Sequence, residues 1–336
     1  MTLKNSKPLP PAQKPEQTPE GAVNQALGRD EALRLALHTT EDELFSSAQA
    51  LRAKHFGRKI ELCAIINARS GSCPMNCVFC SQSSHYHNHG TGSAANFAIL
   101  PAKKLVQQIT ALKELPLRRI GIVTSGKTLP KQDLQELIEA LACLPAHWQG
   151  RVCASLGSLP PADLTLLREA GLSRFHHNLE SSEDFYPNIC TTQTWRSRLQ
   201  TVRSATAAKL EICCGGLFGL GETWQQRIDF ALRLREEGIS NVPLNFLQPQ
   251  PGTPLAGQPP LSAAEALRII AVFRHILPKA TLRVCGGRPL VLQNRQKDIF
   301  AAGANALMTG DYLTTKGQTL QGDLELIQSL GLELTA

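Results

Sequence analysis

Short apolar segments alternate with segments of helical periodicity along most of the chain. Leu, Ile and Ala recur at helical spacing over stretches such as 131–143, 161–170, 224–237 and 262–277. The apolar runs between them have the length and composition of buried β-strands, and they lie at 61–66, 119–124, 151–155, 173–179, 209–214, 241–246, 281–285 and 305–309. About eight strand–helix units with no break in composition predict an α/β protein built as a (β/α)8 TIM-type barrel, in preference to a doubly wound sheet.

The beginning of the chain has a different pattern. Residues 1–25 are rich in Pro, Lys, Gln and Glu and poor in apolar residues, which predicts a disordered tail. From Arg29 onward, Ala, Leu and Phe recur at helical spacing, so we predict a short helical N-terminal extension over 26–58. The barrel domain is then expected to occupy 59–336.

Composition narrows the class of protein. The chain has 336 residues, of which 42% are hydrophobic and 19% charged, so a large core is expected. The formal charge is +7, but the Lys and Arg residues are scattered and not interleaved with aromatic residues, which argues against nucleic-acid binding. The sequence shows neither a secretory signal nor a long apolar stretch, so we expect a soluble, cytoplasmic protein without membrane association. In that compartment, the ten cysteines favour metal binding over disulfides.

Three cysteines follow the first predicted strand. Cys73, Cys77 and Cys80 form the pattern C-x3-C-x2-C, with no fourth cysteine nearby. Thiolates are soft, anionic ligands that suit iron–sulfur clusters, and three of them on a four-iron cluster leave one iron open to a cofactor or substrate. Because the loops after the strands carry the chemistry of TIM barrels, we predict a catalytic cluster at this loop.

A structural zinc site is the alternative for this segment. Tetrahedral zinc would need a fourth ligand from His85, His87 or His89. Structural zinc sites normally show two pairs of ligands, so the iron–sulfur interpretation is favoured. We expect the three histidines to lie in a solvated polar loop.

The cysteine pattern resembles the radical S-adenosylmethionine superfamily, in which the open iron binds that cofactor. Further segments resemble the biotin synthase family from about residue 40 to residue 333, in the family's order. They are CPMNCVFCSQSSHYH, HHNLESSEDFYPNICTTQTW, CCGGLFGLGET and NFLQPQPGTPLAG, followed by LRIIAVFRHILPKATLRVCGGR. Several segments in the right order are far more specific than the cysteine pattern alone.

This resemblance implies a (β/α)8 barrel and a defined reaction. Biotin synthases insert sulfur between two unactivated carbons of dethiobiotin, whose C–H bonds no side-chain base can attack. A 4Fe-4S cluster reduces S-adenosylmethionine to methionine and a deoxyadenosyl radical, and a second iron–sulfur cluster supplies the sulfur. The resemblance therefore implies dethiobiotin as substrate and a flavodoxin or ferredoxin type of electron donor, and we expect a homodimer.

The resemblance also implies roles for individual residues. The cofactor-binding positions are Phe79, Glu180, Arg198 and the glycines Gly216 and Gly219. The substrate-binding positions are Arg69, His177, Asn178, Asn245, Thr314 and Thr315. The chain departs from the family at three of the positions considered, with His176 in place of an asparagine, Glu180 in place of the commoner aspartate and Arg69 where a lysine is frequent.

The second cluster has an unusual ligand set. The family holds it with three cysteines and an arginine, and the matching positions are Cys153, Cys213 and Arg283, but the cysteine of the second strand is Gly121. Cys285 lies two residues after Arg283, so strand alternation places both on one face and Cys285 becomes the candidate for the missing thiolate. Cys214 is a further candidate, which the same alternation disfavours.

Alternatives stay open for the type of the second cluster and for the function of the protein. The second cluster is expected to be remodelled, as a two-iron or a four-iron species, or else to be absent, with its cysteines acting as small hydrophobic residues. Cys63, Cys143 and Cys190 are interpreted as such packing residues. Relatives with other reactions, namely lipoyl-forming sulfur inserters, hydrogenase-cofactor maturases and methylornithine synthases, are the alternative enzymatic function, and a non-catalytic metal-binding protein is the third.

Overall fold

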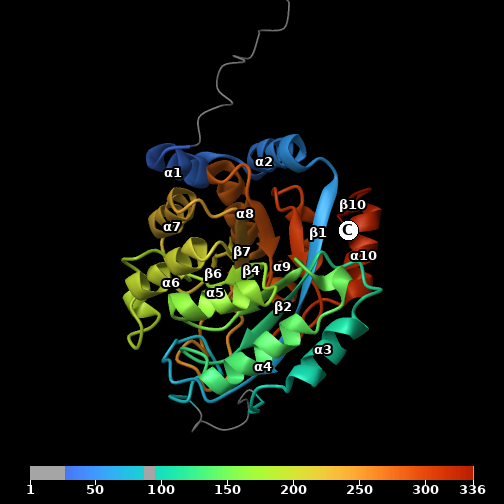
Figure 1. Cartoon of the computed structure of the whole chain (residues 1–336). Helices are drawn as coiled ribbons and strands as arrows, with labels where there is room; N and C mark the ends of the chain where they lie inside the picture. The colour runs from blue at the N-terminus through green and yellow to red at the C-terminus, as the bar shows by residue number, and fades with distance from the viewer. Residues whose placement is uncertain (1–26, 87–94, 336) are drawn as a thin grey trace, which may run out of the picture.

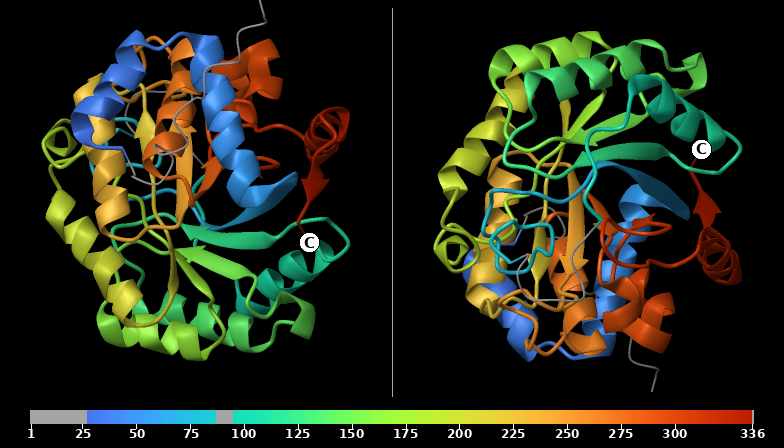
Figure 2. Two further views of the ribbon diagram at one scale, coloured as in Figure 1. Left: turned by 90° about the horizontal axis from the view of Figure 1, so that it is seen from above. Right: turned by 90° about the horizontal axis from the view of Figure 1, so that it is seen from below.

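Parallel strands form a closed barrel surrounded by helices (Figures 1 and 2). The computed structural model describes residues 27–86 and 95–335. Its first strand pairs with β2 on one side and with β9 on the other, and the second pairing closes the ring. The strands are β1 Lys59–Arg69, β2 Arg119–Thr124, β3 Val152–Ser155, β4 Arg174–His176, β5 Glu211–Cys213, β6 Gly216–Phe218, β7 Asn241–Phe246, β8 Thr281–Val284, β9 Ala306–Met308 and β10 Glu333–Leu334.

The fifth strand of the barrel is interrupted. Both β5 and β6 pair with β7, through Cys213 with Asn241 and Leu217 with Asn245. At Gly215, a side chain would overlap the backbone of Pro243, so glycine is required where the strand breaks. Counting β5 and β6 as one position, the ring from β1 to β9 has eight positions, which confirms the predicted (β/α)8 barrel. The short β10 pairs with the start of β1 outside this ring.

Helices follow the strands in the expected alternation. The predicted helices at 131–143, 161–170, 224–237 and 262–277 correspond to α4, α5, α7 and α8 to within one residue at each end. The helices are α1 Arg29–His38, α2 Glu41–Phe56, α3 Ala102–Ala111, α4 Lys131–Ala142, α5 Pro161–Glu169, α6 Trp195–Ala207, α7 Trp224–Glu236, α8 Ala263–Ile276, α9 Arg288–Leu292 and α10 Leu320–Ser329, with short 3-10 helices at Ala146–Trp148, Tyr186–Asn188 and Gln293–Ile299.

The N-terminal extension consists of two helices. Thr40 and Glu43 form a reciprocal capping box at the start of α2, so the chain ends one helix and begins another within two residues. The pair packs against α7 and α8, and Arg29 of α1 forms an ion pair with Asp229 of α7. The predicted tail over 1–25 lies outside the described residues.

Alternation along the strands separates the core from the barrel interior. Outward side chains such as Ile60, Leu62, Ile120 and Ile122 are fully buried against the helices. Their neighbours point inward, where small, polar and sulfur-containing side chains leave an open space. Among the described helices, none is long and apolar enough to cross a membrane.

Candidate active site

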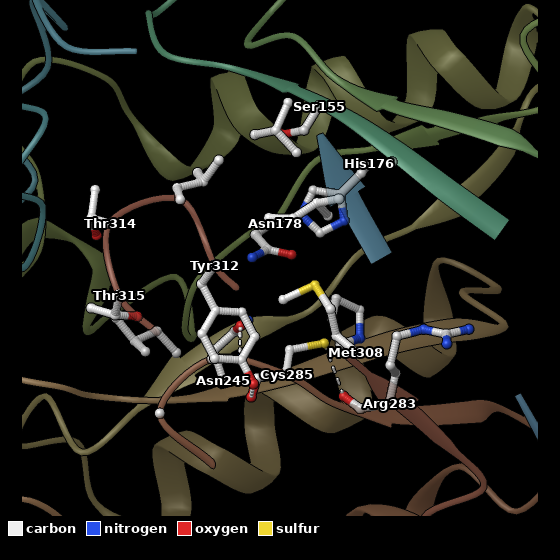
Figure 3. A pocket seen from close by; sticks show the side chains of 18 of the residues that line it. Ser155, His176, Asn178, Asn245, Arg283, Cys285, Met308, Tyr312, Thr314 and Thr315 are labelled. Atoms are coloured by element: carbon white, nitrogen blue, oxygen red, sulfur yellow. Dashed lines mark hydrogen bonds between the residues drawn. The ribbon is translucent and has the colours of Figure 1, made fainter. Parts of the chain in front are cut away.

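The barrel encloses a cavity of about 370 Å³ (Figure 3). Inward-facing residues of the strands form its wall, and loops at the carboxyl ends of the strands form its upper rim. The residues that line the cavity include Cys63, Phe79, Cys80, Arg119, Gly121, Cys153, Arg174, His176, Asn178, Glu180, Cys213, Asn245, Arg283, Cys285, Tyr312, Thr314 and Thr315. One cavity therefore reaches from the cysteine loop to the lower end of the barrel.

The cysteine loop follows β1 directly. Cys73 donates its amide to Gln82 and accepts from Ser84, while the amide of Cys80 bonds the carbonyl of Cys77, so backbone hydrogen bonds hold the loop closed. Cys80 faces the cavity, and burial raises the pKa of its thiol to about 11. Three free thiols on one short, ordered loop at the cavity rim fit a cluster with three thiolate ligands.

A single bound ion fits the loop less well. Within 27–86 and 95–335, no three Cys, His, Asp or Glu side chains converge as ligands of one ion. Thiolates that bind separate irons of a cluster need no such convergence. His85 bonds the carbonyl of Pro74, whereas His87 and His89 lie outside the described residues.

Glu180 and Arg198 form a buried ion pair beside the loop. Their atoms Oε1 and Nη2 are 3.3 Å apart, and Arg198 Nε donates to the carbonyl of Asn178 over 2.6 Å. Burial raises the pKa of Glu180, an effect that Arg198 opposes. Glu180 has φ 69°, and a side chain at Gly216 would overlap its carbonyl, so that glycine permits the close approach of the two strands. Gly219 has φ 92° and donates its amide to Glu222.

A smaller polar cavity of about 130 Å³ adjoins this ion pair. His177 and Arg198 line it, and it shares His176, Asn178 and Glu180 with the main cavity. Burial lowers the pKa of His176 to about 4 and that of His177 well below its usual value, so both imidazoles are neutral at neutral pH. The Nε2 atom of His177 is buried without a hydrogen-bond partner.

Two amides and a threonine loop face the upper part of the main cavity. Asn178 accepts from the amide of Gly215, and Asn245 donates to the carbonyl of Gly216 over 3.1 Å. Thr314 and Thr315 line the same space, beside Tyr312 (Figure 3). No feature of the local sequence distinguishes Tyr312 as a lining residue. By contrast, Arg69 forms an ion pair with Asp133 at 3.1 Å and is not part of the lining of either cavity.

Four cysteines face the cavity below its rim, three of them on β1, β3 and β5 and the fourth directly after β8. They are Cys63, Cys153, Cys213 and Cys285. Burial, followed by the charge of Cys213, raises the pKa of Cys153 to about 12, so this thiol loses its proton only when a metal replaces it. A Cβ atom at Gly121 would lie 3.3 Å from the Cys153 sulfur, so the glycine lets that thiol pack closely against β2.

Arg283 lies among these thiols. Its Nη2 atom is 2.9 Å from Glu61 Oε2. Burial opposes the charge of the guanidinium, but Cys63 and Glu61 outweigh burial and raise its pKa. Thiols, a permanent cation and an enclosed volume fit an anionic iron–sulfur cluster better than they fit hydrophobic packing alone.

The packing interpretation of two cysteines was wrong. Cys63 lines the cavity, and Cys143 is exposed at the end of α4. Cys190 is buried, and its sulfur lies 3.3 Å from Asn76 Oδ1 in the cysteine loop. Cys214 is also buried but does not line the cavity, in line with the alternation of the strand. The apolar run around Cys63 gave no sign that its side chain meets thiols more than 80 residues away.

Two family profiles match adjacent parts of the chain. The Radical SAM superfamily profile matches residues 68–234. The profile of the Biotin and Thiamin Synthesis associated domain matches residues 243–333. The first match covers the cysteine loop and the Glu180–Arg198 pair, and the second covers β8 and the threonine loop.

Curated relatives match nearly the whole chain. The biotin synthase of Desulfovibrio desulfuricans is 58% identical over 304 residues, which are 90% of this chain and 95% of the relative. Those of Desulforudis audaxviator and Acetivibrio thermocellus are 44% and 42% identical and cover 86% and 91% of this chain, and 87% and 94% of their own lengths.

Solved structures share the fold. A methylornithine synthase has a TM-score of 0.78 at 20% identity and covers 93% of this chain and 95% of its own. An FeFe-hydrogenase maturase from Carboxydothermus hydrogenoformans has a TM-score of 0.78 at 18% identity and covers 93% of this chain and 76% of its own. At these identities, the likeness concerns the fold alone.

Proposed function

This chain belongs to the biotin synthase family of radical S-adenosylmethionine enzymes, and we propose that it inserts sulfur into dethiobiotin inside the barrel cavity. The observation that carries the proposal is the composition of that cavity. Cys80 of the cysteine loop, Asn178 and Asn245 on the wall, and Cys153 and Cys285 below them all face one enclosed space. A radical source, a neutral polar substrate and a sulfur source would each find suitable residues there.

The cysteine loop would hold the first cluster. When bound there by Cys73, Cys77 and Cys80, a 4Fe-4S cluster with S-adenosylmethionine supplies the radical that breaks aliphatic C–H bonds. Phe79 lines the cavity beside the loop and shields it from water. The Glu180–Arg198 pair offers a carboxylate for hydroxyl groups of the cofactor and a guanidinium for its carboxylate.

The wall of the cavity would hold dethiobiotin. Its ureido group is neutral, and amide side chains can donate to it and accept from it without adding charge. Asn178 and Asn245 present such groups, and the imidazole of His176 beside them, like that of His177 in the adjoining cavity, adds no charge. The hydroxyls of Thr314 and Thr315 would bind the substrate carboxylate at the rim. Arg69, held by Asp133, is proposed to act on the substrate through its charge at a distance.

The lower part of the cavity would hold the second cluster. We propose Cys153, Cys213 and Cys285 as thiolate ligands, with Arg283 beside them and Cys63 as a fourth thiolate. Four thiolates exceed the family's usual three, so the cluster is proposed to be a four-iron species that carries sacrificial sulfur.

Cysteine variants test this ligand set. The Cys285→Ala and Cys63→Ala variants are each expected to lose iron and sulfide of the second cluster while keeping those of the first. Cys214→Ala is the matched control, because Cys214 is equally buried but faces away from the cavity. If Cys285→Ala keeps the wild-type iron and sulfide counts and spectra, the ligand set is wrong.

An anaerobic assay tests the function itself. The reconstituted protein, with reductant, S-adenosylmethionine and dethiobiotin, is expected to form both deoxyadenosine and biotin. Deoxyadenosine without biotin would reject dethiobiotin while keeping the superfamily chemistry. The Cys77→Ala variant should form neither product, and deoxyadenosine formed by that variant would contradict the role of the loop.

The proposed cellular compartment and partners follow from the thiols and from the need for an electron donor. All ten cysteines are free, which suits a reducing cytoplasm. The reduction step needs a one-electron donor, and a flavodoxin or ferredoxin type of protein is proposed. The homodimer stays a prediction, which sedimentation of the reconstituted protein can test.

A further inference from the structure

The lower end of the cavity is closed by two arginines and one glutamate. Arg119, Arg174 and Glu211 are the first residues of β2, β4 and β5, so they lie at the end of the barrel opposite the cysteine loop. Glu211 Oε2 is 2.9 Å from Arg119 Nη2 and 2.8 Å from Arg174 Nη2. We call these three residues the basal cluster.

The two arginines belong to the cavity, whereas the glutamate belongs to the surface. The side chains of Arg119 and Arg174 are 9% and 7% exposed and line the cavity, but that of Glu211 is 53% exposed. A single carboxylate that reaches solvent therefore bridges the guanidinium groups. Rotation of this one side chain would break the ion pairs of both arginines, whereas Arg119 Nη1 would keep its hydrogen bonds to the Gly150 carbonyl and the Ser173 hydroxyl.

The lower cavity carries an excess of positive charge. Arg119, Arg174 and Arg283 face the carboxylates of Glu61 and Glu211, so three cations meet two anions and one positive charge remains. In addition, the Nε–H group of Arg119 is buried and has no hydrogen-bond partner. A buried cation with an unused donor is costly unless an anion comes to it.

We propose that the basal cluster is a second opening of the barrel, through which hydrosulfide reaches the thiol-lined part of the cavity. This inference rests on the proposed second cluster, whose sulfur is consumed in the reaction and must be replaced. Hydrosulfide is a small anion that fits a gap lined by guanidinium groups. The opening is separate from the upper rim, where the cofactor and substrate would bind.

Position along the barrel supports a route to the second cluster. In the β3–β4 pairing Cys153 lies opposite Arg174, and in the β1–β2 pairing Cys63 lies opposite Arg119. An anion held by either arginine is thus one residue position from a candidate ligand of the cluster. Exchange through this opening is balanced, because one hydrosulfide ion enters for each one that leaves and no atom is oxidised or reduced.

Isotope exchange into the resting holoenzyme tests the opening without turnover. The protein carrying both clusters at natural isotope abundance is incubated with ³⁴S-labelled sulfide, desalted, and its acid-labile sulfide analysed by mass spectrometry. Glu211→Gln removes the negative charge and is expected to speed exchange at least about fivefold. Arg174→Gln is expected to slow it by a similar factor. Glu237→Gln, which removes the ion pair with Arg203 on the surface, is the matched control and should exchange at the wild-type rate.

Two further measurements separate the routes. Saturating S-adenosylmethionine with dethiobiotin, without reductant, should block the upper rim but leave the wild-type exchange rate within about twofold. Raising the salt to 1 M, where the Debye length falls to about 3 Å, should reduce the difference between wild type and Glu211→Gln. Far-UV circular dichroism and thermal unfolding show whether each variant is folded. If Glu211→Gln is not folded, the exchange rates of Arg174→Gln and of wild type saturated with S-adenosylmethionine and dethiobiotin still show whether sulfide enters at the basal cluster.

Distinct results overturn the inference and the proposed function. If the basal variants exchange at the wild-type rate while cofactor and substrate stop exchange, sulfide enters from the upper rim and the opening does not exist. If the reconstituted protein binds only about four irons in total, there is no second cluster, and the inference falls together with that part of the proposed function.

Discussion

The hydroxyl of Tyr312 donates a hydrogen bond of 2.7 Å to the backbone carbonyl of Cys285 (Figure 3). The amide of Tyr312 also bonds the carbonyl of Thr315, so one residue ties the threonine loop both to itself and to the end of β8. The loop that carries Thr314 and Thr315 is thereby tied to the backbone of Cys285.

The Tyr312→Phe variant is expected to bind dethiobiotin more weakly. Without this bond the loop of Thr314 and Thr315 is freer, and ordering it on binding costs about 1 kcal/mol, which corresponds to roughly a fivefold rise in the dissociation constant. Isothermal titration of the reconstituted protein with dethiobiotin in the presence of S-adenosylmethionine measures it. Thermal stability should change little, since the ring stays in place. Unchanged affinity would mean that the loop does not depend on this bond.

The Asp323→Asn variant is expected to be strongly destabilised. Arg288 and Asp323 are fully buried and joined by bonds of 2.7 and 2.8 Å, which fix α10 to the start of α9. Removal of one partner leaves a buried charge unpaired, at a cost of about 3–5 kcal/mol in the free energy of unfolding. Urea unfolding followed by circular dichroism measures this change.

The surface pair Arg203–Glu237 is the control for this measurement. The side chains of Arg203 and Glu237 are 55% and 12% exposed, so solvent reaches the pair from the side of Arg203 and Glu237→Gln should cost about 1 kcal/mol. Equal costs for the two variants would contradict the importance of burial at Asp323.

Stability is expected to fall as the pH drops below neutrality. His275 lies between α8 and α2, where it contacts Ser47 over 3.0 Å, and burial lowers its pKa from 6.5 to about 4. A lowered folded-state pKa means that protonation favours the unfolded chain. The contribution is therefore complete above pH 6.5. It is lost progressively between pH 6.5 and about 4, by up to about 3 kcal/mol.

Urea midpoints across this pH range measure the effect. The His275→Gln variant should show a shallower dependence on pH over the same interval, because the titrating group is gone. A variant with the wild-type slope would assign the pH dependence to other groups.

Gly121→Ala is expected to disturb the second cluster selectively. The added Cβ atom would lie 3.2 Å from a methyl group of Ile65 and 3.3 Å from the Cys153 sulfur, which is tighter than ordinary contact. The Cys153 thiol must therefore shift, and we expect lower iron and sulfide content with unchanged deoxyadenosine formation. Full iron content in Gly121→Ala would show that Cys153 is free to move or is not a ligand.

The sequence predicted the architecture because strands and helices differ in their period. The predicted strand at 119–124 has the same bounds as β2, and the predicted helix at 161–170 exceeds α5 by one residue. The bounds of such elements follow from the local spacing of apolar residues, and that spacing is clear where a segment has one buried face. The run at 173–179 was too long, because β4 ends at His176 and only an isolated pairing of Glu180 with Gly216 follows it.

The membership of the cavity was only partly predictable. Strand alternation correctly separated Cys213 from Cys214, since it needs only the two neighbouring positions. The place of Cys63 in the cavity lining was missed. Its neighbours depend on the register between β1 and β2, in which Cys63 lies opposite Arg119. Likewise, nothing local indicates that Glu211 meets Arg119 across 92 residues of chain. Register between distant strands is a property of the closed barrel.

Closure of the barrel by β1 and β9 also orders events during synthesis of the protein. The thiols of the lower cavity come from β1, β3, β5 and the residue after β8, and the ring that holds them closes with β9, only after about 308 of the 336 residues have been made. The three cysteines of the loop are neighbours from the moment they leave the ribosome. The loop can thus receive iron and sulfide early, whereas the lower site can be filled only after the barrel is complete.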